Sequence, residues 1–381
     1  MSDQIDHYRA EFPITQQYTF LSHAAVSSPS RRVSAAVQHA MQQFLAQPFT
    51  VYLPEIMTLN EELIERIVRL IGARGRDEVV LMPNTAAGLN TVAASLPLQA
   101  GDNILVLDGD YPANVYPWWN LTYRGILTKM VPSHEGGLDL NRLEQRIDRR
   151  TRVIALSTVM FATGFRNDIA AVGQLCKERN IFFVVDAIQS LGAFSMDVQS
   201  SHIDALACGS QKWLLSTPGS GFLYCRRELL DTLVPGAYVG ASSVTDSYNY
   251  LDYNFTSPPG AERFNLGTPN IAGMVALHSA IGLLLEVGIE AIADRIGNLV
   301  DLLIRSLLER GYTLAASADP SHRSGIVVVR TPHAEHICQR LVDAHVIVTS
   351  RGTGVRIAPH FYNTDEEILH CVDLLAQADH T

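Results

Sequence analysis

Two short stretches of this sequence end in residues that could do chemistry. An apolar run, Ile181 to Val185, ends at Asp186, and a second one, Ala205 to Cys208, is followed shortly by Lys212. Open α/β folds usually bind ligands at the carboxyl edge of the sheet, where strands end in this way. A lysine held there is partly removed from water, which lowers its pKa and prepares it for Schiff-base formation. We therefore expect Asp186 and Lys212 to share one site.

The residues around this pair resemble the aminotransferase class V family, which are fold-type I pyridoxal-phosphate enzymes. The likeness rests on Asp186-x-x-Gln189 followed by Ser210-Gln211-Lys212-Trp213, and it extends over nearly the whole chain. The family includes cysteine desulfurases, isopenicillin N epimerase, kynureninase and carbon–sulfur lyases. The resemblance implies pyridoxal 5'-phosphate as cofactor, bound to Lys212 as a Schiff base. It also implies that Asp186 keeps the pyridine nitrogen protonated and that Gln189 donates to the ring oxygen.

The elements that must position these residues alternate between strands and helices. Strands are expected at 103–107, 126–131, 152–156 and 346–349, helices at 59–71, 141–147 and 170–178, and a long loop at 238–259. Such an alternation is typical of a mostly parallel sheet covered on both faces. We expect an α/β fold with an N-terminal segment (1–33) near the site. A large cofactor-binding domain (34–287) with a seven-stranded type of sheet and a smaller α+β domain (288–381) would follow.

A helix start after the strand 78–82 is a candidate phosphate site. Asn84 or Thr85 can cap this helix, and its first backbone N–H groups would then face an anion. An ordinary capped helix is the alternative. The family resemblance implies that Thr85 and Ala86 bind the cofactor phosphate. Gly209 stands where relatives have a phosphate-binding serine, so Ser210 and Gln211 are expected to supply those hydrogen bonds.

Two further residues match ligand-binding positions of the family. Tyr111 follows the strand 103–107, where its counterpart stacks on the cofactor ring, although this aromatic cluster could instead pack a domain interface. Arg356 lies in a β run, where a guanidinium can grip a carboxylate with two hydrogen bonds. Its counterpart binds the α-carboxylate of the substrate. Arg351 could act likewise or pair with a surface acid.

The N-terminal segment and a later loop complete the expected site. His23 and Ala24 lie in a stretch of small residues that passes beside the substrate in relatives, although a lone histidine is more often structural. The family counterpart of Gly267-Thr268 reaches across a dimer interface to the phosphate of the neighbouring subunit. The resemblance therefore implies a homodimer in which one subunit completes the site of the other.

The sequence departs from the cysteine desulfurases in two places. Phe161 replaces an asparagine near the ring oxygen, and no cysteine lies between Val346 and Arg356 to attack substrate sulfur as a thiolate. We therefore expect an aminotransferase, a β-eliminating carbon–sulfur lyase or an epimerase acting on a small α-amino acid through a Schiff base. A desulfurase and a non-catalytic cofactor-binding homologue are the alternatives. A dinucleotide oxidoreductase is disfavoured, because Gly219-x-Gly221 precedes a strand and not a helix.

Composition limits the partners and the compartment. The 381 residues carry a formal charge of −10, which argues against a nucleic-acid or anionic-membrane partner. Residues 1–12 contain no apolar signal region, and charges interrupt the long apolar runs. Five cysteines without metal-like spacing fit reduced thiols and no metal site. We expect a cytoplasmic enzyme.

Overall fold

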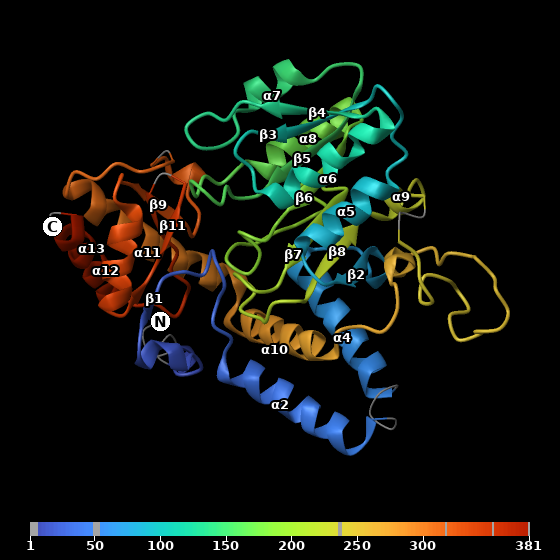
Figure 1. The fold of residues 1–381 in the computed structure, drawn as a ribbon, viewed down its shortest axis with the longest axis horizontal. Coiled ribbons are helices and arrows are strands. Elements are labelled where there is room, and N and C mark those ends of the chain that lie inside the picture. Colours follow the sequence, from blue (N-terminus) through green and yellow to red (C-terminus); the bar gives the residue numbers. More distant parts are fainter. Residues whose placement is uncertain (1–6, 49–53, 235–237, 317, 353, 380–381) are drawn as a thin grey trace.

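The computed structural model describes residues 7–48, 54–234, 238–316, 318–352 and 354–379 (Figure 1). Its centre is a seven-stranded sheet in which β8 alone runs antiparallel to its neighbours. The predicted mostly parallel α/β sheet is therefore confirmed. In spatial order the strands are β2 (Val79–Met82), β8 (Gly221–Cys225), β7 (Ala205–Gly209), β6 (Phe182–Asp186), β5 (Thr151–Ser157), β3 (Asn103–Leu107) and β4 (Leu127–Val131).

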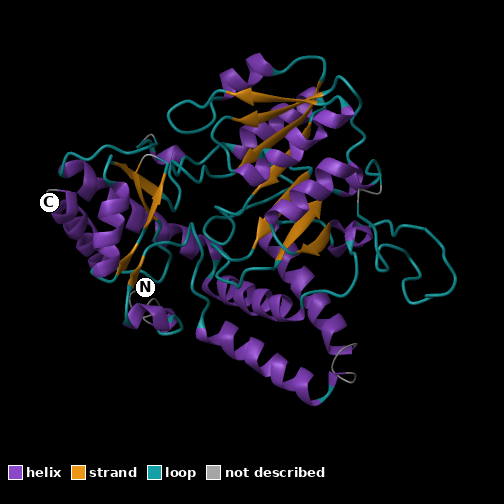
Figure 2. Ribbon diagram, viewed as in Figure 1, coloured by secondary structure: helices purple, strands orange, loops and turns teal. Residues whose placement is uncertain are grey.

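Helices cover both faces of this sheet (Figure 2). Alternate residues of β7 belong to different apolar clusters, Leu206 and Cys208 to one and Ala205 and Ala207 to the other, as strand geometry requires. The first cluster includes side chains of α4 (Pro54–Ile71), α8 (Ile169–Arg179) and α10 (Ile271–Val287), and the second those of α5 (Thr85–Ser95), α6 (Tyr116–Trp119) and α9 (Arg227–Leu230). The remaining helices of this part are α2 (Arg31–Ala46), which packs on α10, and α7 (Leu140–Arg146).

A smaller group of elements follows Gly288, where α10 and α11 meet at a bend of 78°. It contains α11 (Ile289–Glu309), α12 (Ala334–Asp343) and α13 (Asp365–Asp379), and a sheet in the order β11 (Thr349–Arg351), β12 (Gly354–Ile357) and β9 (Val327–Arg330). The expected domain division at 287/288 falls at this bend and stays a prediction. Short 3-10 helices occupy Pro13–Gln16, Arg76–Glu78, Pro112–Asn114, Asn120–Arg124, Ala261–Phe264 and Pro320–His322.

The predicted single strand over 346–349 is wrong. The chain forms two strands there, because β10 (Val346–Ile347) pairs in parallel with β1 (Thr19–Phe20) while β11 pairs with β12. The N-terminal strand, more than 300 residues away in sequence, supplies the partner that splits the run. The N-terminal segment is thereby fixed to the C-terminal elements.

The other expected elements agree with the structure to within a few residues. The helix expected over 59–71 begins earlier, at Pro54, and the expected loop over 238–259 contains no helix or strand among its residues (Figure 2). In the described part of the chain no single helix is both long and apolar enough to cross a membrane, although the bent pair α10 and α11 would pass that test together.

Candidate active site

The structure brings Asp186 and Lys212 to the same edge of the central sheet. Asp186 is the last residue of β6, and Lys212 follows the neighbouring parallel strand β7 by three residues. Asp186 is only 2% exposed, and its burial raises the pKa of the carboxyl group to about 7, against the hydrogen bond that Ile188 N donates to Oδ1. Burial lowers the pKa of Lys212 to about 8, with a further lowering from the charge of Arg356.

These two groups are not in direct contact. Among the described residues, no carboxylate oxygen lies within 4.0 Å of Lys212 Nζ, and Ile188 N is the one donor to the Asp186 carboxylate. Asp186 is buried and Lys212 is half-buried, and each is incompletely satisfied, which is costly unless a further polar group binds them. The pair therefore suits a ligand that offers an aldehyde to the lysine and a basic nitrogen to the acid.

An aromatic pair lies beside Lys212. Lys212 Nζ lies 5.5 Å from the centre of the Tyr111 ring, and the Phe161 ring meets Tyr111 edge-on at 5.1 Å and 79°. Tyr111 is 43% exposed, so its ring has an uncovered face on which a flat heterocycle could stack. The structure thus places Tyr111 beside the lysine, as the sequence predicted, with Phe161 as its support.

The start of α5 is fastened to the end of β7. Asn84, not Thr85, is the N-cap, since its Oδ1 accepts the Ala87 N–H at 2.8 Å. Thr85 Oγ1 accepts the N–H of Gly209 at 2.8 Å. A Cβ on Gly209 would lie 2.8 Å from Gln211 Oε1 and 3.2 Å from Thr85 Oγ1. Glycine is therefore the residue that allows this helix start to approach the lysine loop.

Ser210 and Gln211 differ in what they offer a phosphate. Ser210 is fully buried, and its hydroxyl lies 2.8 Å from the carbonyl oxygens of Thr217 and Ser220 and 2.7 Å from Ser220 Oγ. These contacts make Ser210 a brace of the following loop, whereas the sequence predicted a phosphate ligand. Gln211 is half-buried and stays a candidate ligand of the cofactor phosphate.

Arg356 points toward the site from the small sheet. It is 2% exposed, and its Nη1 donates to the carbonyl oxygen of Phe161 at 3.1 Å. Burial and then the charge of Arg351 lower the pKa of this guanidinium to about 10. No carboxylate pairs with Arg356 among the described residues, so its remaining donors are available for a carboxylate ligand.

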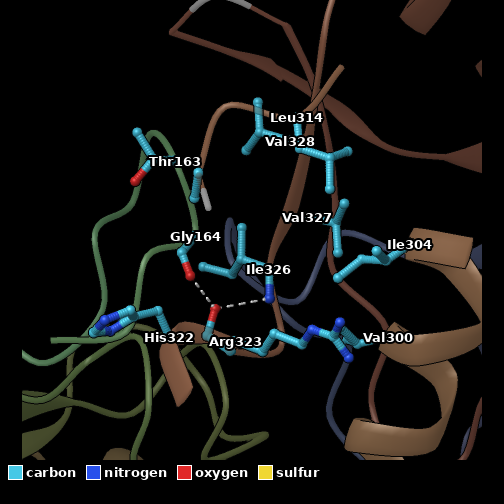
Figure 3. A pocket seen from close by; sticks show the side chains of 12 residues that line it. Thr163, Gly164, Val300, Ile304, Leu314, His322, Arg323, Ile326, Val327 and Val328 are labelled. Carbon is cyan, nitrogen blue, oxygen red and sulfur yellow. Dashed lines mark hydrogen bonds between the residues drawn. The ribbon is translucent and has the colours of Figure 1, made fainter. Parts of the chain in front are cut away.

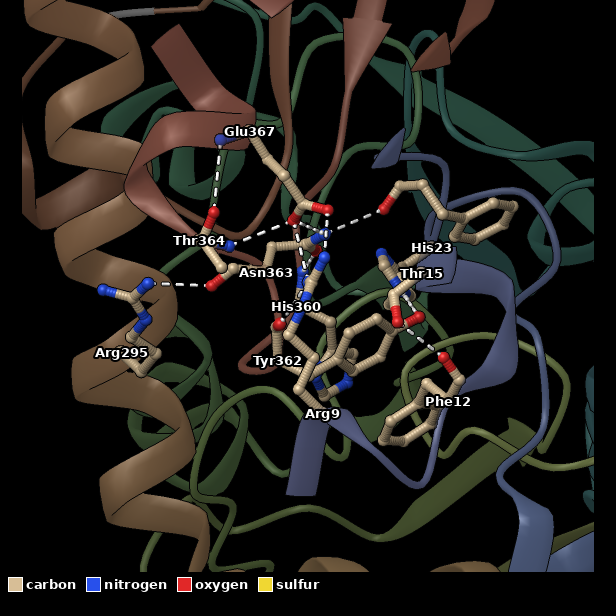
Figure 4. A network of polar contacts seen from close by, with 11 residues as sticks. Arg9, Phe12, Thr15, His23, Arg295, His360, Tyr362, Asn363, Thr364 and Glu367 are labelled. Atoms are coloured by element: carbon tan, nitrogen blue, oxygen red, sulfur yellow. Dashed lines mark hydrogen bonds and ion pairs between the residues drawn. The ribbon is translucent and has the colours of Figure 1, made fainter. Parts of the chain in front are cut away.

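His23 is fully buried and belongs to the network of polar contacts drawn in Figure 4. Its Nδ1 lies 2.8 Å from the carbonyl oxygen of Ala358, which can only accept, so Nδ1 carries the proton. Its Nε2 then accepts from the Tyr362 hydroxyl at 2.8 Å. Burial lowers the pKa of His23 to about 4, so the ring is neutral. Both nitrogens have protein partners, which favours the structural role that the sequence left open.

Ala24 contributes its backbone and not its side chain. Gln189 Nε2 donates to Ala24 O at 3.1 Å, and Gln189 Oε1 accepts from Trp213 Nε1 at 3.1 Å. Ser27 N also donates to Gln211 O at 2.8 Å. The N-terminal segment therefore lies directly against the loop that carries Lys212.

Trp213, His360 and Tyr362 form a buried layer under the lysine that sequence reasoning missed. His360 Nε2 donates to Trp213 O, and the His360 ring stacks on Tyr362 with centroids 6.1 Å apart. The layer continues to Glu367, which accepts from Arg9 Nη2 at 2.7 Å and from Thr364 N at 3.0 Å and so caps α13 (Figure 4). His360, which follows Arg356 closely in the sequence, was the signal from which this layer could have been inferred.

Within one chain, Thr268 does not lie beside the other predicted site residues. Gly267 and Thr268 are exposed and line a groove of about 1380 Å³ between α4, α5 and the loop 238–270, whose lining does not include Lys212, Asp186 or Arg356. A second cavity, between Gly164 and Ile326, holds only about 20 Å³ (Figure 3), which is room for one water molecule and not for a substrate.

The five cysteines are free and buried. Cys208 is the one nearest to Lys212 in sequence, and its thiol donates to Gly209 O at 3.3 Å. Burial raises the pKa of this thiol well above its usual range, so it is not a thiolate nucleophile. Among the described residues, no three His, Cys, Asp or Glu side chains gather as a metal-ligand set.

Known proteins resemble this chain along nearly its whole length. The family model "Aminotransferase class-V" matches residues 19–369. The chain belongs to the aminotransferase class V family. It is similar to an uncharacterized aminotransferase, YcbU, of Bacillus subtilis, with 31% identity over 97% of both chains. The fold matches an apo cysteine desulfurase from Thermococcus onnurineus (TM-score 0.89, 24% identity, 98% of both chains). It also matches the cystine C-S lyase C-DES (TM-score 0.89, 22% identity, 96% of this chain and 99% of that one).

Membership of the class V family establishes the cofactor and the broad activity. The chain is a pyridoxal-phosphate-dependent transferase or lyase that acts on amino acids. The donor set fits that cofactor: a lysine and an acid at one sheet edge that do not pair with each other, a partly exposed aromatic ring, and a glycine that lets a helix start approach.

Proposed function

We propose that this class V enzyme removes the α-proton of a bound amino acid with Lys212, and that no cysteine takes part. The observation that carries the proposal is that buried Asp186 and half-buried Lys212 lie at one sheet edge without pairing with each other. Transamination, β-elimination and epimerisation all begin with this step. An aminotransferase, lyase or epimerase activity is therefore favoured over a persulfide-forming desulfurase.

Each residue of the site has a proposed role toward the cofactor. Lys212 is its covalent attachment point and Asp186 holds a proton on its ring nitrogen, while Tyr111 stacks on the ring. The second N–H of Gln189 is available to the ring oxygen, since the first bonds to Ala24 O. The phosphate binds to Gln211 and to the first N–H groups of α5, at Thr85 and Ala86, because a helix N-terminus attracts anions.

Bound pyridoxal phosphate supplies an electron sink for the charge left on the substrate when its α-proton leaves. Arg356 binds the α-carboxylate with its free donors and so fixes which bond of the α-carbon faces Lys212. When it is not bonded to the cofactor, Lys212 Nζ would be neutral in an appreciable fraction of molecules, because burial has lowered its pKa to about 8. A neutral amine can take the α-proton and return it at another atom.

The absence of a usable thiol separates this proposal from the desulfurase alternative. A persulfide mechanism needs a low-pKa cysteine that reaches the substrate sulfur. Cys208 points into the core with a raised pKa, and no cysteine occurs on the segment 346–356. Free, buried thiols also support a reducing compartment, for which the cytoplasm is our proposal.

We also propose a homodimer in which Gly267-Thr268 of one subunit reaches the phosphate site of the other. Two features support it: Thr268 is exposed in the single chain, and it lines a large groove with apolar members such as Leu266, which is 51% exposed. A second copy of this chain would cover those side chains.

The direct test is α-proton exchange. Protein loaded with pyridoxal phosphate is incubated with single amino acids in D₂O, and loss of the α-proton signal is followed by NMR. The wild type should catalyse exchange, and Lys212→Ala should slow it by roughly 10²–10⁴-fold, the usual worth of a general base. Exchange that persists unchanged in Lys212→Ala would refute the proposed role of the lysine.

A further inference from the structure

The small sheet presents a second arginine on the same face as Arg356. In the β11–β12 pair, Arg356 lies opposite Thr349, and Arg351 follows Thr349 by two residues. Side chains two apart on a strand share a face, and diagonal neighbours of this kind are within reach of long side chains. The residue directly opposite Arg351 is Gly354, which has no side chain. No side chain at that position therefore competes with Arg351 for the shared face.

Both arginines lack an acid partner. Among the described residues, no carboxylate pairs with Arg351, whose side chain is exposed and makes only a long hydrogen bond, 3.3 Å, to Ser350 O. The charge of Arg351 lowers the pKa of both Arg356 and Lys212, so this charge acts on the site. Two neighbouring cations without an anion repel each other, which disfavours the arrangement unless a ligand carries negative charge.

A polar atom between the arginines also awaits a partner. The Thr349 hydroxyl is buried, and it bonds to no described residue. It lies on the shared face, directly opposite Arg356 and two residues before Arg351. A buried hydroxyl without a hydrogen bond is costly, and a ligand oxygen would satisfy it.

The β11–β12 hairpin, which carries Arg351, closely approaches the loop beside Lys212. A Cβ on Gly352 would lie 3.3 Å from Ala162 O, next to Phe161, whose carbonyl oxygen binds Arg356 and whose ring supports Tyr111. The two arginines and the aromatic pair therefore border one space.

We propose that Arg351 binds a second acidic group, carried by the side chain of the substrate, so that this enzyme acts on acidic amino acids. An α-amino acid has one α-carboxylate, and Arg356 accounts for it. A side-chain carboxylate or sulfinate would neutralise the second guanidinium and accept from Thr349. This assignment rests on the proposed function, and it adds the substrate class.

The alternative is that Arg351 assists Arg356 with the α-carboxylate. The two roles differ in which ligands lose affinity when Arg351 is replaced. A role at the α-carboxylate affects every amino acid alike, whereas a role at the side chain affects only those with a second acid.

The experiment compares matched pairs: aspartate with asparagine, and glutamate with glutamine, with cysteine sulfinate as a further acid. Binding to cofactor-loaded protein is measured by titrating the change in visible absorption, for wild type, Arg351→Gln and Arg356→Gln. Arg340→Gln, an exposed arginine on α12, is the control. A cofactor-independent arm measures succinate and butyrate binding to cofactor-free protein by calorimetry.

Wild type should prefer the acidic member of a pair by about tenfold or more, as expected for a charge-assisted hydrogen bond. Arg351→Gln should bring that ratio close to one without weakening the neutral member, and Arg340→Gln should change nothing. Equal affinity for both members in wild type, or equal losses for both in Arg351→Gln, would overturn the proposal. If amino acids leave the absorption unchanged but succinate binds more tightly than butyrate, the proposed function fails and the double-anion site stands.

Discussion

His360 Nε2 donates to the carbonyl oxygen of Trp213 at 3.2 Å, and Trp213 directly follows Lys212. The other ring nitrogen of His360, Nδ1, accepts from Phe361 N at 2.9 Å, so the tautomer is fixed. His360 is fully buried, and burial lowers its pKa well below the usual range. It is therefore a neutral side chain that positions the lysine loop and does not take part in proton transfer.

Replacing His360 should loosen the lysine while leaving the chain folded. In His360→Asn the shorter side chain cannot reach Trp213 O, so we expect a loss of about 1–3 kcal/mol in the free energy of unfolding, the cost of a buried hydrogen bond. The pKa of Lys212 should also rise toward its ordinary value, because a loosened loop admits water. Thermal unfolding and the pH dependence of Lys212 acylation measure the two effects. His336→Asn, at an exposed position, is the control. A destabilised variant with an unchanged lysine pKa would show that His360 supports the fold only.

The reactivity of Lys212 should rise with pH through about 8 in cofactor-free protein, since only the neutral amine reacts and burial has lowered the pKa to that value. Arg351→Gln removes a positive charge that disfavours the protonated amine, so its midpoint should lie at higher pH than that of wild type. The measurement is the rate of reductive methylation of Lys212 between pH 6 and 10, read by mass spectrometry. A midpoint near that of a free lysine would contradict the burial of the amine.

Asp186 should make the stability of cofactor-free protein depend on pH. Its folded-state pKa, about 7, lies above the ordinary value of 3.8 that it has in the unfolded chain, so the folded state binds more protons between these values. The stabilisation is complete below the unfolded pKa and is lost as pH rises through the folded one. Asp186→Asn should remove that decline and unfold at higher temperature than wild type near pH 8. Denaturation at pH 5 and pH 8 tests the sign, and parallel pH profiles for the two proteins would contradict it.

Subunit mixing tests whether Thr268 acts across a dimer. Lys212→Ala and Thr268→Asp should each be inactive, the second because it places a negative charge beside the phosphate. A mixed dimer would contain one site with wild-type Lys212 and wild-type Thr268. Activity after random mixing should reach about a quarter of wild type, since half of the dimers are mixed and each has one intact site.

The control pair for this mixing is Lys212→Ala with Asp186→Asn. Both residues belong to the same chain's site, so no mixed dimer has an intact one. Failure of the first pair to regain activity, with dimers shown by light scattering, would place Thr268 outside the neighbouring site.

The parts of the site that depend on local sequence patterns could be predicted from the sequence. Asp186 and Lys212 could be placed because apolar runs mark the ends of parallel strands, and the helix over Ile271–Val287 follows from a long, predominantly apolar segment. The strands β10 and β11 could not be separated, because the partner of β10 is a two-residue strand at the other end of the chain.

The polar contacts behind the lysine depend on three-dimensional packing in the same way. Nothing in the sequence shows that His23 is satisfied by Ala358 and Tyr362, or that the Ser210 hydroxyl turns toward Thr217. Hydrogen bonds between residues far apart in sequence decide whether a polar side chain faces a ligand or braces the fold. The sequence could therefore name these residues but not assign their roles.

The most direct test of the account is the visible absorption spectrum of protein loaded with pyridoxal phosphate, for wild type and Lys212→Ala. We predict that wild type shows a visible band that borohydride bleaches, and that Lys212 then carries the reduced cofactor in a peptide digest. Lys212→Ala should lack both the band and the labelled peptide. A wild-type protein that cannot be loaded, or a label on another lysine, would contradict the assignment of Lys212 and the mechanism built on it.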